Sequence, residues 1–338
     1  METTMIQTEG LTKHFTAGSS TVEAVRGIDL TVRPGEMVAL LGPNGAGKST
    51  TLRMLTTLLP PTAGVARVAG YDVTAHQAQV RRRIGYIGQG NGAGHSQRGR
   101  DELVAQGRAY GMPKAAARSR ADELVGSLDL TEVADRKVMS LSGGQRRRLD
   151  IAMGLIHEPD LLFLDEPSTG LDPQNRANLQ AHIVALRNRH ETTVVLTTHY
   201  LDEADALAER VVVVDHGRVV ADDTPARLKA TLAGDRVTLA FATPVEAARA
   251  SGRARAVAES VAQDGRTLEL RVRDGDRLLP ALLRDLDAHG TAVVSAELTR
   301  PTLDDVFLNL TGRSLREGRA AHDVRTTDTD LATEEACA

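Results

Sequence analysis

The chain has 338 residues, of which 41% are hydrophobic and 25% are charged, a composition typical of a globular protein that folds in water. Its 41 Lys and Arg residues face 45 Asp and Glu residues, and the resulting net charge of −4 gives no reason to expect a nucleic-acid partner. No apolar run approaches the roughly 18 residues of a membrane-spanning helix, and the first ten residues lack the features of an export signal.

The first aromatic residue of interest is Phe15, which we expect on a turn between two short strands within residues 6–29. An aromatic ring at this place can stack on a purine base through its π-face. A Phe that belongs to the hydrophobic core is an equally good interpretation of this residue alone. The choice between the two depends on the motifs that follow.

The stretch from Gly42 to Ser49 matches the phosphate-loop pattern G-x-x-x-x-G-K-[ST]. An apolar run of strand length, 37–41, precedes it, and an apolar pattern of helical period opens at Thr50. Glycines allow successive N–H groups to face one concavity, and the following helix points its positive end at the same place. We therefore expect Lys48 to reach the β- and γ-phosphates of a nucleotide and Ser49 to bind Mg²⁺. The expected nucleotide-binding residues of this stretch are Gly42, Pro43, Asn44, Gly45, Ala46, Gly47, Lys48, Ser49 and Thr50.

Two further short strands are predicted after the phosphate loop and its helix, at 65–68 and 84–87, and the second runs into Gln89. A segment with several glycines follows. An Ala-rich helical pattern then extends over 100–129 and is broken at 111–113.

A second constellation is the Leu-Ser-Gly-Gly-Gln stretch at 141–145, which precedes a helix expected over 146–157. Ser142 lies where a helix N-cap belongs, and Gly143 and Gly144 leave backbone N–H groups open to an anion. An ordinary capped helix would show the same residues. The closeness of this stretch to the motif that follows argues against an ordinary capped helix.

Two apolar strands are followed by residues that can take part in catalysis or metal binding. The strand 161–164 leads into Asp165 and Glu166, and the strand 193–197 delivers His199. A carboxylate at the end of a buried parallel strand beside a phosphate loop is where Mg²⁺ is held, and the next carboxylate can polarise an attacking water. The histidine emerges at the sheet edge where ligands bind in open α/β sheets.

The composition changes after Asp222, where alternating patterns predict strands at 236–241 and 267–272, and a leucine stripe predicts a helix over 278–286. These elements show no catalytic constellation.

A last helix is expected over 303–310, with Thr302 as its N-cap and Gly312 as its stop. We interpret residues 233–312 as a small α+β domain, either a packing or dimer-stabilising domain or a regulatory one. The tail at 313–338 is acidic and poor in apolar residues, and we expect it to be disordered.

In this order, the motifs of the chain resemble the ATP-binding subunits of ABC transporters over residues 6–228. The six motifs are the phosphate loop, the glutamine after the second strand pair, the Leu-Ser-Gly-Gly-Gln stretch, the Asp-Glu strand end, a Ser-Thr-Gly-Leu-Asp turn at 168–172, and the strand-end histidine. The resemblance implies the α/β fold of P-loop NTPases, with a RecA-like parallel core, an antiparallel β subdomain and a helical subdomain at about 90–158. It assigns the ATP-binding domain to residues 4–232.

The resemblance also implies a head-to-tail dimer, of identical or pseudo-symmetric subunits, that holds two ATP molecules at its interface. Each ATP would touch the phosphate loop of one subunit and residues 142–145 of the other. Glu166 would act as general base, and Phe15 matches the position that stacks on adenine, where the family usually has Tyr. The implied catalytic residues are Glu166, His199, Gln89 and Lys48. The implied Mg²⁺ ligands are Ser49, Gln89 and Asp165, and the implied nucleotide contacts outside the phosphate loop are Phe15, Ser142, Gly143, Gly144, Gln145 and Asp172.

A finer resemblance links the chain to exporter ATPases of the daunorubicin-resistance type, through residues 146–152, 198–204 and 301–308. It implies an ATPase that drives efflux of a hydrophobic drug or antibiotic through a separate integral membrane permease, at the cytoplasmic face of the membrane. The alternatives are an exporter subunit for a lipid or polysaccharide and a soluble ABC ATPase that does not transport. The phosphate-loop motif occurs once and no heptad pattern is sustained, which disfavours the soluble class. An ATP sensor without turnover is disfavoured by Glu166.

Overall fold

The computed structural model describes residues 4–17, 20–90, 92–94 and 96–312, and the chain separates into two compact units. The first unit ends at Asp223 and the second begins at Thr224. The tail at 313–338, which was expected to be disordered, lies outside the described residues. Within the described part of the chain, no helix combines the length and the apolar character that a bilayer crossing requires.

A six-stranded sheet in the order β10-β9-β3-β8-β7-β6 forms the centre of the first unit. Its strands pair in parallel except for the antiparallel edge strand β10. Every residue of β3, β7 and β8 is buried, as expected for parallel strands covered on both faces. The strands expected at 37–41, 84–87, 161–164 and 193–197 are confirmed. The six strands are β3 (Met37–Leu41), β6 (Ile84–Ile87), β7 (Leu161–Asp165), β8 (Thr193–Thr198), β9 (Arg210–Asp215) and β10 (Arg218–Asp223).

A second, antiparallel sheet in the order β2-β1-β4-β5 shares a hydrophobic core with the central sheet. The expected turn around Phe15 is wrong, because Phe15 lies inside β1 and pairs with Val22 of β2. These two strands are 12 and 13 residues long. Register shifts around Gly10 let their pairing continue past a residue that would end a regular strand. The strands are β1 (Ile6–Ala17), β2 (Ser20–Val32), β4 (Ala63–Val68) and β5 (Tyr71–Asp72).

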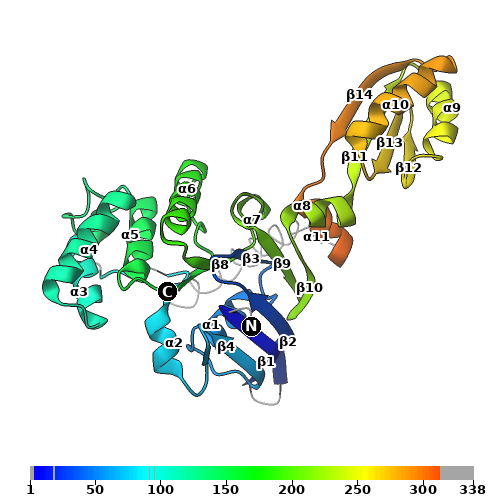
Figure 1. Ribbon diagram of the computed structural model, residues 1–338. Helices are drawn as coiled ribbons and strands as arrows, with labels where there is room; N and C mark the ends of the chain where they lie inside the picture. Colours follow the sequence, from blue (N-terminus) through cyan, green and yellow to red (C-terminus); the bar gives the residue numbers. More distant parts are fainter. Residues whose placement is uncertain (1–3, 18–19, 91, 95, 313–338) are drawn as a thin grey trace, which may run out of the picture. The chain divides into compact units, whose positions relative to one another are not determined.

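The helices of the first unit include a group, α3, α4 and α5, that packs together beside the central sheet (Figure 1). The expected helical stretch 100–129 is confirmed as α3 and α4, which are separated at the predicted break. The helix expected to begin at Arg146 begins at Gly143 instead, because Ser142 is its N-cap. The helices are α1 (Lys48–Leu55), α2 (Gln77–Arg83), α3 (Gly99–Ala109), α4 (Lys114–Ser127), the 3₁₀ turn η1 (Val138–Ser140), α5 (Gly143–Leu155), α6 (Pro173–His190) and α7 (Leu201–Leu207).

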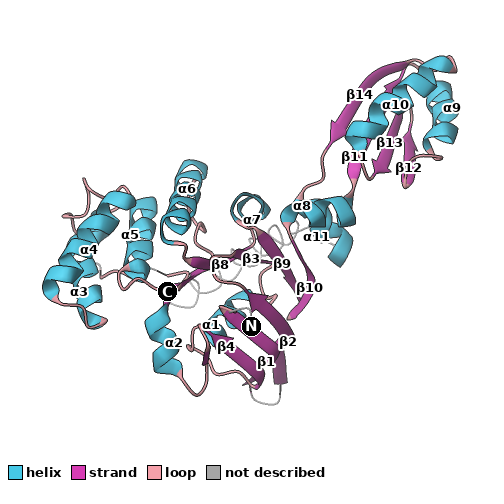
Figure 2. Cartoon of the chain, in the orientation of Figure 1, coloured by secondary structure: helices cyan, strands magenta, loops and turns pink. Residues whose placement is uncertain are grey.

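The second unit has a four-stranded antiparallel sheet in the order β12-β13-β11-β14, with α9 and α10 on one face (Figure 2). Alternate residues of β11 and β13 form its core with these helices. The last helix, α11, packs mainly against α8 and η2 of the same unit, and Thr302 and Gly312 cap it as expected. The elements are α8 (Pro225–Leu228), the π-helical turn η2 (Lys229–Ala233), β11 (Asp235–Phe241), α9 (Pro244–Ala254), β12 (Ser260–Asp264), β13 (Thr267–Val272), α10 (Gly275–Ala288), β14 (Val293–Thr299) and α11 (Leu303–Thr311).

Candidate nucleotide site

The phosphate loop connects β3 directly to α1 and is wedged between backbone segments on two sides. A Cβ atom on Gly42 would lie 2.1 Å from the carbonyl oxygen of Val214. Gly47 has a φ of 102°, and a Cβ there would lie 2.4 Å from the carbonyl oxygen of Ala24. Only glycine fits these two positions, so the loop holds a fixed concave shape whose N–H groups surround the start of α1.

The side chain of Lys48 folds back into this loop, and only 4% of the residue's surface is exposed. Its Nζ donates hydrogen bonds to the carbonyl oxygens of Gly42 at 2.7 Å and Pro43 at 3.0 Å. Burial lowers the pKa of Lys48, and the neighbouring Glu166 and Asp165 carboxylates oppose this effect in part. A buried ammonium group whose hydrogen-bond partners are neutral carbonyls is well placed to exchange them for phosphate oxygens.

Asp165 lies fully buried at the end of β7, close to the other side chains that are expected to bind the metal. Its Oδ1 accepts hydrogen bonds from the hydroxyl groups of Ser49 at 2.8 Å and Thr197 at 2.7 Å. Gln89 Nε2 donates to Ser49 Oγ at 3.4 Å. A hydroxyl, a carboxylate and an amide oxygen are hard ligands that suit Mg²⁺. The residues therefore fit Mg²⁺. Among the described residues, no group of three or more His, Cys, Asp or Glu is placed to hold a metal.

Glu166 follows Asp165 and faces two basic groups. Its Oε1 lies 3.3 Å from His199 Nδ1 and 3.8 Å from Lys48 Nζ, and its Oε2 accepts a hydrogen bond from Thr169 Oγ1 at 3.2 Å. Burial raises the pKa of Glu166, but the hydrogen bond and charge of His199 and the charge of Lys48 lower it more, so it lies below the ordinary value. An ionised carboxylate beside the phosphate loop is the form that can accept a proton from water.

The Leu-Ser-Gly-Gly-Gln stretch forms the amino end of α5 through a capping box. Ser142 Oγ accepts from the Gln145 N–H at 3.3 Å, and the Ser142 N–H donates to Gln145 Oε1 at 3.0 Å. Ser142 and Gly143 are exposed. In the described part of the chain, no hydrogen bond joins residues 142–145 to the phosphate loop of the same chain. The exposed Ser142 and Gly143 make the amino end of α5 accessible to an anion from outside the chain.

Two other predicted contacts lie at exposed positions. Phe15 is 41% exposed, so the core interpretation of this residue is excluded, and Lys13 Nζ lies 5.4 Å from the centre of its ring. Asp172 is exposed and caps α6, where its Oδ1 accepts from the Asn175 N–H at 2.9 Å. Both side chains are accessible to a ligand or to a second chain.

Two residues near this site were given no role by the sequence analysis, although Arg147 lies in the stretch 146–152 that carries the finer resemblance. Thr197 accepts a hydrogen bond from the Glu166 N–H at 3.0 Å, in addition to its bond with Asp165. Arg147 in α5 donates to the Asp165 carbonyl oxygen at 3.2 Å. A threonine in an otherwise apolar strand and an arginine next to a helix start are weak local signals, because their partners lie far away in the sequence.

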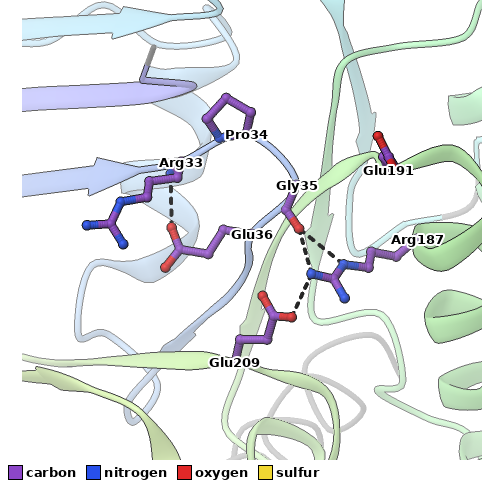
Figure 3. Close-up of a pocket in the computed structure, with 7 residues that line it drawn as sticks. All are labelled: Arg33, Pro34, Gly35, Glu36, Arg187, Glu191 and Glu209. Atoms are coloured by element: carbon purple, nitrogen blue, oxygen red, sulfur yellow. Dashed lines mark hydrogen bonds and ion pairs between the residues drawn. The ribbon is translucent and has the colours of Figure 1, made fainter. Parts of the chain in front are cut away.

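A hollow of about 870 Å³ lies at the opposite edge of the central sheet, before β3 and β9 begin (Figure 3). Arg187 donates there to the Gly35 carbonyl oxygen at 2.8 Å and to Glu209 Oε1 at 2.6 Å. Ligands of open α/β sheets bind at the carboxyl ends of the strands, so this edge is not the expected nucleotide site. The residues that line the hollow are Arg33, Pro34, Gly35, Glu36, Arg187, Glu191 and Glu209.

Comparison with known proteins gives two family matches. A family model described as ABC transporter matches residues 25–169, and a second, described as ATP-binding protein DrrA1-3-like, C-terminal domain, matches residues 224–311. A solved dimeric ATP-binding cassette in a post-hydrolysis state with ADP and Pi has a TM-score of 0.60 and 26% identity. That match covers 65% of this chain and 98% of the solved one.

Several relatives of this chain match it over nearly its whole length. The daunorubicin/doxorubicin resistance ATP-binding protein DrrA of Streptomyces peucetius is 44% identical over 92% of this chain and 93% of its own. The daunorubicin resistance ATP-binding protein DrrA3 of Streptomyces coeruleorubidus is 42% identical over 95% of this chain and 100% of its own. The linearmycin resistance ATP-binding protein LnrL of Bacillus subtilis is 34% identical over 93% of this chain and 100% of its own.

Proposed function

This chain belongs to the family of ABC transporter ATP-binding proteins, and we propose that it is the ATP-hydrolysing subunit of an exporter for a hydrophobic drug or antibiotic. The observation that carries the proposal is the arrangement of Lys48, Asp165, Glu166 and His199 around one phosphate loop at the carboxyl edge of the central sheet. The relatives that are named for resistance to daunorubicin, doxorubicin and linearmycin support drug export rather than export of a lipid or polysaccharide.

In the proposed reaction, ATP and water give ADP and phosphate. The Lys48 ammonium leaves the Gly42 and Pro43 carbonyls for the oxygens of the β- and γ-phosphates, where negative charge accumulates in the transition state. Mg²⁺, when bound, neutralises part of this phosphate charge, and Ser49, Asp165 and Gln89 are the residues that would hold it.

Glu166 accepts a proton from the attacking water in this proposal. Its pKa below the ordinary value keeps the carboxylate ionised at neutral pH, and His199 and Thr169 hold its two oxygens in fixed directions. His199 shares Glu166 Oε1 with Lys48, and the proposal assigns it a contact with the γ-phosphate as well. Phe15 supports the adenine ring from an exposed place on β1.

We further propose that a second subunit completes the nucleotide site. Ser142 and Gly143 at the amino end of α5 are exposed, and this end makes no hydrogen bond with the phosphate loop of its own chain within the described residues. A head-to-tail dimer, of two copies or of two related chains, would place this helix end against the phosphates bound by the partner, with Asp172 at the interface. The relative solved as a dimer with ADP and Pi supports this arrangement.

The proposed organisation assigns ATP binding to residues 4–232 and an accessory role in packing or dimer stability to residues 233–312. The chain would act at the cytoplasmic face of the membrane, where a separate integral membrane permease receives the motion of the dimer. No nucleic-acid partner is proposed, since the charge of the chain is slightly negative.

The variant Glu166→Gln tests this proposal in the purified chain. With ATP and Mg²⁺ present, we expect the variant to bind ATP, to lose phosphate release and to accumulate as a dimer in size-exclusion chromatography, whereas the unmodified chain turns over. A Glu166→Gln chain that hydrolyses ATP normally would refute the role of the base. A variant that stays monomeric at saturating ATP would refute the shared site.

A further inference from the structure

Arg147, on the first turns of α5, is buried with 8% of its surface exposed and holds three separate carbonyl oxygens. Its Nη1 donates to the Gly88 oxygen at 2.7 Å, its Nε to the Pro167 oxygen at 2.8 Å and its Nη2 to the Asp165 oxygen at 3.2 Å. A guanidinium presents its N–H groups in fixed directions of one plane, so it can bind several carbonyls at once.

These three carbonyls flank the residues to which we assign hydrolysis. The Gly88 carbonyl belongs to the peptide bond that joins it to Gln89, and Asp165 and Pro167 lie on either side of Glu166. Glu166 has a φ of 49°, a left-handed conformation that is unfavourable for a residue with a side chain. Such a backbone conformation persists only where its surroundings hold it in place.

A second side chain on α5, one turn later, binds the segment that follows Gln89. Asp150 is 5% exposed, and its Oδ1 accepts hydrogen bonds from the N–H groups of Gly92 at 3.0 Å and Ala93 at 3.2 Å. The same helix therefore holds the backbone on both sides of Gln89, through Arg147 before it and Asp150 after it. It also holds the backbone on both sides of Glu166.

We propose that Arg147 is a positioning residue that places Glu166 and Gln89 for hydrolysis and couples them to the amino end of α5. This inference rests on the proposed function, in which that helix end meets the nucleotide of the partner subunit. Movement of α5 against the partner's phosphates is then passed through one guanidinium to the base and the glutamine of its own chain.

Arg148 provides a matched control, because it is the next residue of α5 and is also 8% exposed. Its Nη1 donates to Asn178 Oδ1 of α6 at 3.0 Å, away from the hydrolytic residues. Loss of either arginine removes a buried cation from the same helix. Only loss of Arg147 removes the support of Glu166 and Gln89.

The test compares Arg147→Met, Arg147→Lys and Arg148→Met in steady-state ATP hydrolysis, with the thermal unfolding midpoint of each chain as a measure of folding. We expect Arg147→Met to lower kcat by about 10- to 100-fold with little change in the KM for ATP, the signature of misplaced catalytic groups. Arg147→Lys keeps the charge without the planar geometry, so its kcat should lie between those of Arg147→Met and the unmodified chain. Arg148→Met should retain most of the kcat even where its unfolding midpoint drops.

A second measurement does not depend on turnover. In the Glu166→Gln background, added Arg147→Met should leave ATP-induced dimer formation intact, because the proposal assigns Arg147 to positioning and not to ATP binding. Loss of that dimer, or a kcat for Arg147→Met within about twofold of Arg148→Met, would overturn the inference. If Arg147→Met does not fold, the kcat of Arg147→Lys is compared with that of Arg148→Met instead, and a value within about twofold would overturn the inference. An unmodified chain without ATPase activity would instead refute the proposed function, and this inference would end with it.

Discussion

His199 Nδ1 lies 3.3 Å from Glu166 Oε1, although the two residues follow different strands of the central sheet. Strands β7 and β8 are parallel neighbours, so the residues after their carboxyl ends meet at one edge. The pairing lowers the pKa of Glu166. Burial alone would raise the pKa of this carboxyl, and its hydrogen bond and charge interaction with His199 are the largest contributions that lower it.

The first prediction concerns the pH dependence of turnover. A base must be deprotonated to act, so the rate falls as pH drops through the pKa of Glu166, and a lowered pKa keeps this loss at low pH. In His199→Ala the largest lowering contributions are gone, while those of Lys48 and Thr169 remain, so the acid limb of the kcat profile should move to higher pH. The profile is measured from pH 4, below the ordinary glutamate pKa of about 4.3, up to pH 9 for both chains, with His289→Ala in the second unit as control. An acid limb that stays in place in His199→Ala would contradict this assignment.

The second prediction concerns the backbone of the phosphate loop. Gly47→Ala puts a Cβ 2.4 Å from the Ala24 carbonyl oxygen at a φ of 102°, so the loop must shift. We expect a loss of stability of at least about 1–2 kcal/mol and a strong loss of ATP binding, measured by urea unfolding and by equilibrium nucleotide titration.

The control for Gly47→Ala is Gly126→Ala in α4, where a Cβ meets no atom within 4 Å. Alanine is the better helix former, so this change should be neutral or stabilise by up to about 1 kcal/mol and leave ATP binding unchanged. Equal ATP affinity for Gly47→Ala and Gly126→Ala would contradict the assigned role of the loop.

The third prediction concerns Phe15. Its ring is 41% exposed, so Phe15→Ala should change the free energy of unfolding little, yet it should raise the KM for ATP several-fold if the ring stacks on adenine. Phe15→Tyr keeps the ring and should preserve the KM. Val65→Ala removes a similarly exposed apolar side chain, 46% exposed on β4, and serves as control. A KM for Phe15→Ala that equals the value of the control would end the stacking proposal.

The sequence predicted β3, β6, β7 and β8 of the central sheet but not β9 and β10, and the success with three of these strands has a physical reason. Strands β3, β7 and β8 are covered on both faces, so their residues form short uninterrupted apolar runs that stand out from the surrounding chain. The N-cap at Ser142 was also predictable, because a capping box depends on residues only three positions apart. Motifs with these local signals led directly to the phosphate loop, Asp165 and Glu166.

The contacts that the sequence could not reveal are those between distant segments. Phe15 was expected on a turn, yet β1 continues past it because its pairing with β2 compensates for the break at Gly10. Arg147 binds carbonyl groups 18, 20 and 59 residues away, and backbone carbonyls have no side-chain identity that a sequence pattern can register. Such residues become visible only when the fold brings their partners together.

The fourth prediction concerns Thr197, the buried threonine of β8 that the motifs did not include. Its hydroxyl donates to Asp165 Oδ1 at 2.7 Å and accepts from the Glu166 N–H at 3.0 Å. Thr197→Val keeps the shape of the side chain, but it removes one donor from a fully buried carboxylate and one acceptor from the strained Glu166 backbone. We expect a loss of about 1–3 kcal/mol in the free energy of unfolding together with a lower kcat.

Thr193→Val separates the two effects in the same strand. Thr193 is also fully buried, but its hydroxyl accepts from the Gly35 N–H at 2.9 Å, at the amino end of β8 and away from the phosphate loop. This variant should lose comparable stability in urea unfolding and keep the kcat of the unmodified chain. Because both variants remove one buried hydroxyl from one strand, an equal kcat for the two would mean that Thr197 supports the fold and has no part in placing Asp165 and Glu166.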